Sequence, residues 1–129
     1  MDNTVNNNTR PIHLDLTKMH FPITAIISIL HRVSGVMLFL LLPFALYCLS
    51  QSLQSHGTFV GLTETLRTPI FIILMWILLS AAFFHLIAGI RHIIMDGGFF
   101  EALKPARRSA LIVIILEIIA IFGLGVWLW

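Results

Sequence analysis

The sequence has few charged residues and a single cysteine, and both shortages narrow what the chain can be. Charged side chains make up 11% of the 129 residues, whereas 58% are hydrophobic and the mean hydropathy is +0.96. A chain this apolar does not form a soluble core, so we predict one integral membrane domain, residues 1–129, embedded in a lipid bilayer. The lone cysteine, Cys48, excludes an internal disulfide, a dithiol redox pair and a cluster bound only by cysteines of this chain.

The chain also starts without the apolar run of a secretory signal. Residues 1–10 are polar and rich in asparagine. Residues 11–22 mix leucine with charged residues and histidine and end at Pro22, which disfavours a continuous helix through the segment. We therefore expect residues 1–22 to form a short cytoplasmic and interfacial segment.

Long apolar stretches are abundant, and three of them are long enough to cross a membrane. We predict spans at about residues 24–49, 69–91 and 109–129, joined by loops at 50–68 and 91–108. At about 1.5 Å per residue, residues 69–90 form a helix roughly 33 Å long, which crosses a hydrocarbon core about 30 Å thick. The fold class is therefore all-α, with three transmembrane helices. Three helices leave a bundle open on one side, so we expect them to join a larger, multi-subunit bundle.

Lysine and arginine are distributed unevenly around these spans. Three occur in the N-terminal segment and at the start of the first span, four in the second loop, one in the first loop and none after the third span. The positive-inside rule places the N-terminus and the second loop in the cytoplasm and the C-terminus outside. In so apolar a chain the basic residues indicate topology, and no nucleic-acid partner is expected.

One ionisable residue, His85, lies deep in the second apolar stretch. Such a residue is costly in a bilayer and by default indicates a functional site. Ala88, Gly89 and His92 share its helical face, and two small residues beside an imidazole leave room for a flat, bulky group. A haem whose iron is bound by the neutral His85 imidazole fits this description. The alternative is a buried histidine that is hydrogen-bonded to a neighbouring helix.

A second polar group begins the first span, where Ser28, His31 and Arg32 lie on one helical face. The Arg32 guanidinium suits a haem propionate or a quinone carbonyl, Ser28 suits a quinone, and His31 suits iron or a propionate. The plainer alternatives are that Arg32 extends to lipid phosphates and that Ser28 packs between helices. With the topology above, the two polar groups lie at one depth near the cytoplasmic leaflet. The residues expected at this depth are Ser28, His31, Arg32, His85, Arg91 and His92.

Three further points follow from these residues. His31 is expected nearer the surface than His85. A single-chain haem bound by both residues is conceivable, but we favour a haem whose second histidine comes from another subunit. Arg91 has an acid, Asp96, one turn away and could pair with it. Glu117 lies about 12 Å into the third span, where a carboxylate is protonated or paired with another helix. We favour a structural hydrogen bond for Glu117 over a proton relay.

Two motifs resemble those of a known family. Arg10-Pro11 followed by residues 28–34 (SILHRVS) is similar to the first signature of the cytochrome b subunit of succinate dehydrogenase, complex II. Residues 85–98 (HLIAGIRHIIMDGG) resemble its second signature. The resemblance covers essentially the whole chain and is strongest to bacterial members, whose sequence before the first motif is similar to residues 21–26 (FPITAI).

This resemblance implies a function and a site. The chain would be a membrane anchor of succinate:ubiquinone oxidoreductase in the bacterial inner membrane, without dehydrogenase chemistry of its own. Its partners would be a flavoprotein, an iron–sulfur protein and a second anchor that supplies the other axial histidine of a shared haem b. His85 matches the family's axial ligand, Ser28 and Arg32 match its ubiquinone site, and His31 and Arg32 match positions near the haem propionates. The alternative is a small transport or assembly protein that uses its intramembrane polar groups otherwise.

Overall fold

The computed structural model describes residues 21–100 and 102–129. Within these residues the chain forms four α-helices and no strand, which confirms the all-α class. The helices are α1 (Ile23–Gln54), α2 (His56–Leu66), α3 (Pro69–Asp96) and α4 (Leu103–Leu128). Of these, α1, α3 and α4 are long and apolar enough to cross a membrane. Most of the expected N-terminal segment, including Arg10-Pro11, lies outside the described residues.

The prediction of a loop over residues 50–68 is wrong. α1 continues to Gln54, and α2 follows after the single residue Ser55. A capping box starts α2: the Ser55 hydroxyl accepts from the Thr58 amide at 3.1 Å, and the Thr58 hydroxyl accepts from the Ser55 amide at 3.0 Å. The usual sequence pattern for this motif ends in glutamate or glutamine, so a threonine at this position did not indicate a helix start.

The second predicted loop, residues 91–108, is too long by several residues at each end. α3 continues to Asp96, and α4 begins at Leu103. The connection contains Gly98 at a φ of 84°, a left-handed conformation that glycine adopts without strain. The start of α3 is as expected, since Pro69 occupies the first helical position, where a missing amide hydrogen costs nothing.

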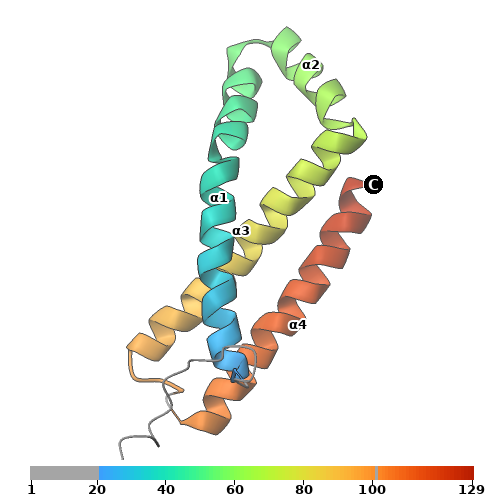
Figure 1. Ribbon diagram of the computed structural model, residues 1–129. Helices are drawn as coiled ribbons and strands as arrows, with labels where there is room; N and C mark the ends of the chain where they lie inside the picture. Colours follow the sequence, from blue (N-terminus) through green and yellow to red (C-terminus); the bar gives the residue numbers. More distant parts are fainter. Residues whose placement is uncertain (1–20, 101) are drawn as a thin grey trace, which may run out of the picture.

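α3 is the central helix, and it packs against both α1 and α4 (Figure 1). α1 crosses α3 in the half of the molecule opposite to α2, whereas α4 runs beside α3. The three helices meet in a small core around Ile27, Phe84, Ala88, Ala110 and Val113. Ala88 and Ala110 are fully buried, and their small side chains allow α3 and α4 to approach closely.

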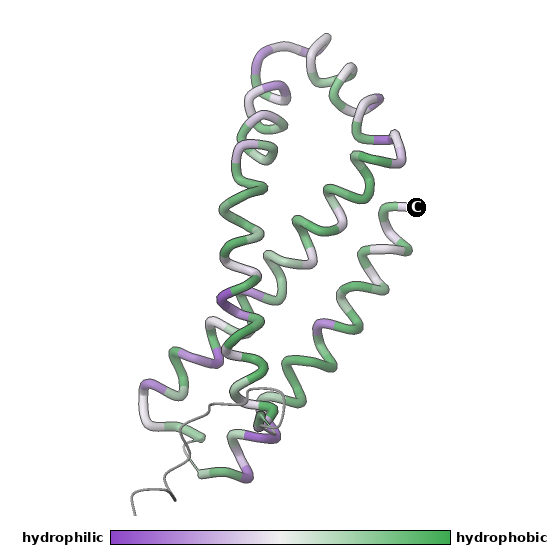
Figure 2. The backbone as a smooth tube through the Cα atoms, in the orientation of Figure 1, coloured by the Kyte–Doolittle hydropathy of each residue, from purple (hydrophilic) through white to green (hydrophobic). Residues whose placement is uncertain are grey.

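The outer surfaces of the long helices are apolar. Figure 2 shows hydrophobic residues through most of α1, α3 and α4, and hydrophilic residues mainly at the helix ends, on α2 and where α1 crosses α3. Phe122 and Val126 on α4 are 72% and 84% exposed. Such large exposed side chains are expected of helices that face lipid rather than water.

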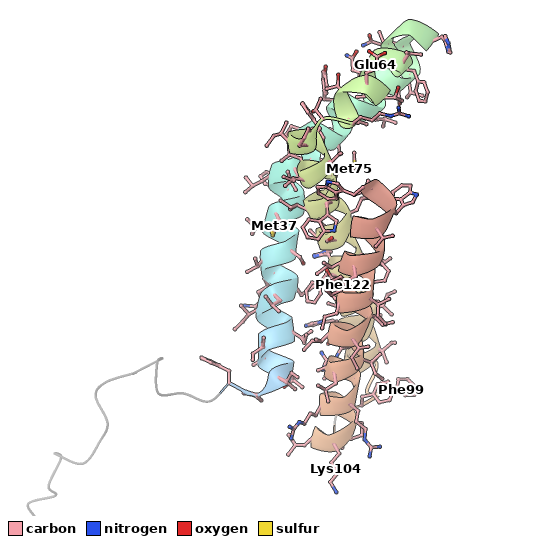
Figure 3. The ribbon with its side chains drawn as sticks, turned by 90° about the vertical axis from the view of Figure 1, so that its right-hand side faces the viewer. Met37, Glu64, Met75, Phe99, Lys104 and Phe122 are labelled. Atoms are coloured by element: carbon pink, nitrogen blue, oxygen red, sulfur yellow. The ribbon has the colours of Figure 1, made fainter. Side chains whose placement is uncertain are left out.

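The connections fall at two opposite ends of the molecule. The start of α1, the α3–α4 connection and the start of α4 share one end, whereas α2 and the end of α4 share the other. Figure 3 places Lys104 at the first of these ends and Glu64 of α2 at the second. The cytoplasmic location of the first end remains a prediction from the charge distribution.

Candidate functional site

Three imidazole rings stack where α1 crosses α3, and we call them the imidazole cluster: His31, His85 and His92. The His31 ring of α1 lies 4.1 Å from the His85 ring, with the two planes inclined by 17°. It lies 5.0 Å from the His92 ring, at 21°. His85 and His92 are seven residues apart on one face of α3, so His31 fits between them as a side chain of the crossing helix.

Two glycines make this close approach possible. A Cβ atom at Gly35 of α1 would lie 3.1 Å from Cε1 of His85, and one at Gly89 of α3 would lie 3.3 Å from Nε2 of His31. Each glycine therefore accommodates an imidazole of the opposite helix. The room that the sequence predicts beside Gly89 is filled by His31 and is not open to a ligand.

Hydrogen bonds fix the orientation of His85. Its Nδ1 lies 3.0 Å from the Ser34 hydroxyl and 3.2 Å from the His31 carbonyl oxygen. The Ser34 hydroxyl donates its own hydrogen to that same carbonyl at 2.7 Å, so it can only accept from His85. We therefore assign the hydrogen to Nδ1, which leaves the Nε2 lone pair available.

This arrangement fits a metal-binding histidine. Such residues usually donate their second ring nitrogen to a carbonyl or carboxylate, which fixes the tautomer and the direction of the ligating nitrogen. Among the described residues, Nε2 of His85 has no hydrogen-bond partner. Among the described residues, the imidazole cluster included, no three side chains are placed to hold one metal ion together. His85 can therefore provide one bond to an iron whose other ligands lie elsewhere.

His31 and His85 do not fit as the two axial ligands of one haem. Axial imidazoles approach iron from opposite faces of the macrocycle, which then lies between the rings. Stacked rings 4.1 Å apart leave no space for a macrocycle between them. The single-chain haem considered from the sequence, with His31 and His85 as its two ligands, is thus not supported.

His92 connects the imidazole cluster to Ser28. Its Nδ1 lies 2.7 Å from the Ala88 carbonyl oxygen, and its Nε2 lies 3.5 Å from the Ser28 hydroxyl. Ser28 is half-buried, whereas Arg32, one turn further along α1, is exposed. The guanidinium of Arg32 is therefore free to reach a group that lies against the outside of α1.

Arg91 does not join these residues. It is 6% exposed and turns to α4, where Nε donates to the Ser109 hydroxyl at 3.0 Å and Nη2 to the Ala106 carbonyl at 3.2 Å. The suggested pairing of Arg91 with Asp96 is not formed. Of the six residues expected at one depth, four gather around the crossing, Arg32 lies on the outside and Arg91 stabilises the α3–α4 contact.

A cavity of about 410 Å³ lies between α1, α3 and α4, and Ser34, which contacts His85, is one of its lining residues. Leu30, Val33 and Met37 form one stripe of α1 along this cavity, whereas His31 and Gly35 face the imidazole cluster on the other flank. The lining is almost entirely apolar, so the cavity offers few groups to orient a polar ligand.

Glu117 lies beside this cavity, and its Oε2 has no hydrogen-bond partner among the described residues; the same holds for Ser80 Oγ. Trp76 donates to the Ile121 carbonyl at 2.9 Å, and Arg91 donates to Ala106. The antiparallel register set by these two bonds places Ser80 opposite Glu117. The hydrogen bond that we favour for Glu117 on sequence grounds is thus not made within this part of the chain.

Sequence reasoning missed Ser34 and Gly35 as parts of the site. Ser34 follows His31 by three residues and Gly35 by four, so both share its side of the helix, and this spacing was the available signal. Their partner, His85, is 51 residues from Ser34 in the sequence. That contact depends on how α1 crosses α3.

Comparisons with known proteins place this geometry in context. Residues 6–124 match the family described as "Succinate dehydrogenase/Fumarate reductase transmembrane subunit". The chain is 48% identical over 124 residues to the succinate dehydrogenase cytochrome b556 subunit of Coxiella burnetii, which covers 95% of this chain and 99% of that protein. It is 34% identical to the succinate dehydrogenase cytochrome b560 subunit of Reclinomonas americana, covering 95% and 87% of the two chains. The cytochrome b556 subunit of Paracoccus denitrificans is 28% identical over 82% of each chain.

Proposed function

The chain belongs to the family of transmembrane subunits of succinate dehydrogenase and fumarate reductase, and we propose that it binds haem b through His85 in a succinate:ubiquinone oxidoreductase. The observation that carries this proposal is the hydrogen-bonded His85 ring. Nδ1 is held by Ser34 and the His31 carbonyl, and Nε2 is left without a partner in the described chain. The names of the relatives, which are cytochrome b subunits, agree with a haem.

Haem b, when bound, supplies a site that takes up and returns one electron at a time. The chain's own contribution is to hold His85 rigidly. Gly35 leaves room beside Cε1 of the ring, His31 stacks on the ring, and Ser34 fixes the position of Nδ1. Because His31 and His85 cannot share one iron, we propose that a second membrane subunit provides the other axial histidine and that the haem lies between the two subunits.

The haem carries two propionates, and two residues of α1 suit them. Arg32 is a fixed cation on the exposed side of α1, in the half of the helix nearer the end that we place at the cytoplasmic interface. His31 lies one residue away in the imidazole cluster. We propose that both residues contact or neutralise propionates at that end of the bundle.

We further propose that Ser28 and Arg32 contribute to a site for ubiquinone. Both are hydrogen-bond donors, they lie one helical turn apart, and Ser28 is half-buried beside His92. A quinone carbonyl gains negative charge as it is reduced, so a donor in a place with little water stabilises the reduced form most. The chain itself then shapes the site, while electrons arrive from the soluble subunits.

We also propose which partners the chain has and where it lies. It docks an iron–sulfur subunit and a flavoprotein on the bacterial inner membrane, together with the second anchor. The end of the molecule that holds the imidazole cluster faces the cytoplasm, because most lysine and arginine residues gather there. The C-terminus then faces the periplasm.

Purification of the tagged chain from its native membrane tests the proposal. We expect three companion subunits and a b-type signal in the reduced-minus-oxidised visible spectrum. Companions without a b-type signal would contradict the haem site. A chain that purifies alone, or with unrelated transport components, would instead favour a small transport or assembly protein.

A further inference from the structure

We propose that His92 positions the Ser28 hydroxyl and replaces the proton that Ser28 gives to the reduced quinone, an inference that rests on the quinone site proposed above. His92 is outside the set of residues that the motifs connect with haem or quinone. Its ring nevertheless stacks on His31 and lies within hydrogen-bond distance of the Ser28 hydroxyl.

The tautomer of His92 follows from its two contacts. The Ala88 carbonyl, 2.7 Å from Nδ1, is only an acceptor, so Nδ1 carries a hydrogen in both the neutral and the charged ring. Nε2 is therefore the nitrogen that can gain or lose a proton. It faces the Ser28 hydroxyl at 3.5 Å, a long hydrogen bond of the kind that shortens when a substrate orders the site.

The surroundings hold the His92 ring in this orientation. His31 of α1 stacks on one face at 5.0 Å, and Ala88, its partner on α3, is fully buried. On α3, the acid Asp96 lies one turn beyond His92 on the same face, whereas Arg91 turns to Ser109 and Ala106 of α4. The residue next to His31 in the sequence, Arg32, carries a fixed charge but lies on the exposed side of α1.

The proton transfer balances without a further reagent. The enzyme delivers two electrons to the quinone, and one quinone oxygen takes the hydrogen of the Ser28 hydroxyl. Ser28 Oγ takes the hydrogen from Nε2 of the charged His92 at the same time. The net change is one proton moved from the imidazolium to the quinone oxygen, with Ser28 unchanged and His92 neutral with its hydrogen on Nδ1. His92 is half-buried and four residues before the end of α3, so water at that end can return the proton.

A double-mutant cycle on the assembled complex tests this role. The variants are Ser28→Ala, His92→Gln and the two together, and His56→Gln on the exposed part of α2 is the control. Glutamine can contact Ser28 but cannot deliver a proton. Succinate–ubiquinone reductase activity is compared with reduction of a dye that accepts electrons from the soluble subunits. Haem content checks assembly.

We expect His92→Gln to lower quinone reduction about tenfold or more, relative to dye reduction, because general acid catalysis contributes at least that much. The double variant should be no slower than Ser28→Ala, since His92 acts through Ser28. The pH dependence of quinone reduction should also differ between the wild type and His92→Gln, because only the wild type has an imidazole at this position to supply the proton. His92→Asn, which can still donate to the Ala88 carbonyl, replaces the glutamine variant if the latter does not assemble.

The possible failures are distinguishable. If Ser28→Ala leaves quinone reduction unchanged, the proposed quinone site is wrong. If Ser28→Ala is slow but His92→Gln is normal, or if the two effects multiply in the double variant, the quinone site stands and the role of His92 is overturned. An unaltered pH profile in His92→Gln would likewise overturn it.

Discussion

The ring of His31 lies face to face with the ring of His85, with centroids 4.1 Å apart, and the His31 carbonyl oxygen lies 3.2 Å from Nδ1 of His85. One residue of α1 therefore supports His85 twice, through its side chain and through its backbone. This double support gives His31 a structural role that does not require it to bind iron. Nε2 of His85 remains directed away from these contacts, as a ligand to a haem requires.

Ser34→Ala should weaken haem binding without abolishing it. The substitution removes the hydroxyl that accepts from Nδ1 of His85, while the His31 carbonyl remains. Loss of such a supporting hydrogen bond typically costs about 10- to 100-fold in metal affinity. The rate of haem transfer from the purified complex to apomyoglobin measures the change. Ser52→Ala, near the opposite end of α1, is the control, and equal rates for the two variants would show that Ser34 does not support the site.

Gly35→Ala should displace the His85 ring. The added Cβ would lie 3.1 Å from Cε1 of His85, so the ring or the helix crossing must move. Overpacking of this kind costs about 1–3 kcal/mol, which should appear as lower haem content and a lower thermal unfolding midpoint of the complex.

Gly123→Ala is the matched control, because nothing lies within 4 Å of a Cβ at that position of α4. Alanine is also the better helix former there, so Gly123→Ala should be neutral or slightly stabilising. If Gly35→Ala behaved like Gly123→Ala, the close contact of α1 with His85 would be absent from the assembled protein.

The membrane orientation can be tested with a reporter that is active only outside the cytoplasm. Fusions near Gly57 and after Trp129 should be active, and a fusion near Gly98 should be inactive. The physical reason is the concentration of lysine and arginine at the end of the molecule that contains Gly98. The reverse pattern would contradict the charge distribution and place the imidazole cluster near the outer leaflet.

Much of the fold and the family were predictable from the sequence, because both depend on local signals. Apolar length alone located α1, α3 and α4, and the motifs around His31 and His85 identified the family, which the comparisons confirm. α2 was missed because its cap differs from the usual pattern. The sequence could not predict that the Arg91 side chain turns to α4 or that Ser34 contacts His85. Both contacts depend on how each helix is rotated against its neighbour.

The hydrogen-bond partner of Glu117 also could not be predicted from the sequence. Its depth in the third span could be counted from the sequence, but its partner could not. In the described chain it lies opposite Ser80, and both have an oxygen without a hydrogen bond. A buried polar group left in this state is destabilising, so its role depends on what the assembled complex adds at that position.

The most direct test of the central claim is the absorption and electron paramagnetic resonance spectrum of the complex that carries His85→Leu. We expect loss of the low-spin, six-coordinate b-type signal, since iron loses the one nitrogen that this chain supplies, while His56→Leu on α2 keeps the signal. The soluble subunits should still copurify, because helix packing does not depend on one imidazole. An unchanged low-spin spectrum in assembled His85→Leu complex would contradict the assignment of His85 as a haem ligand.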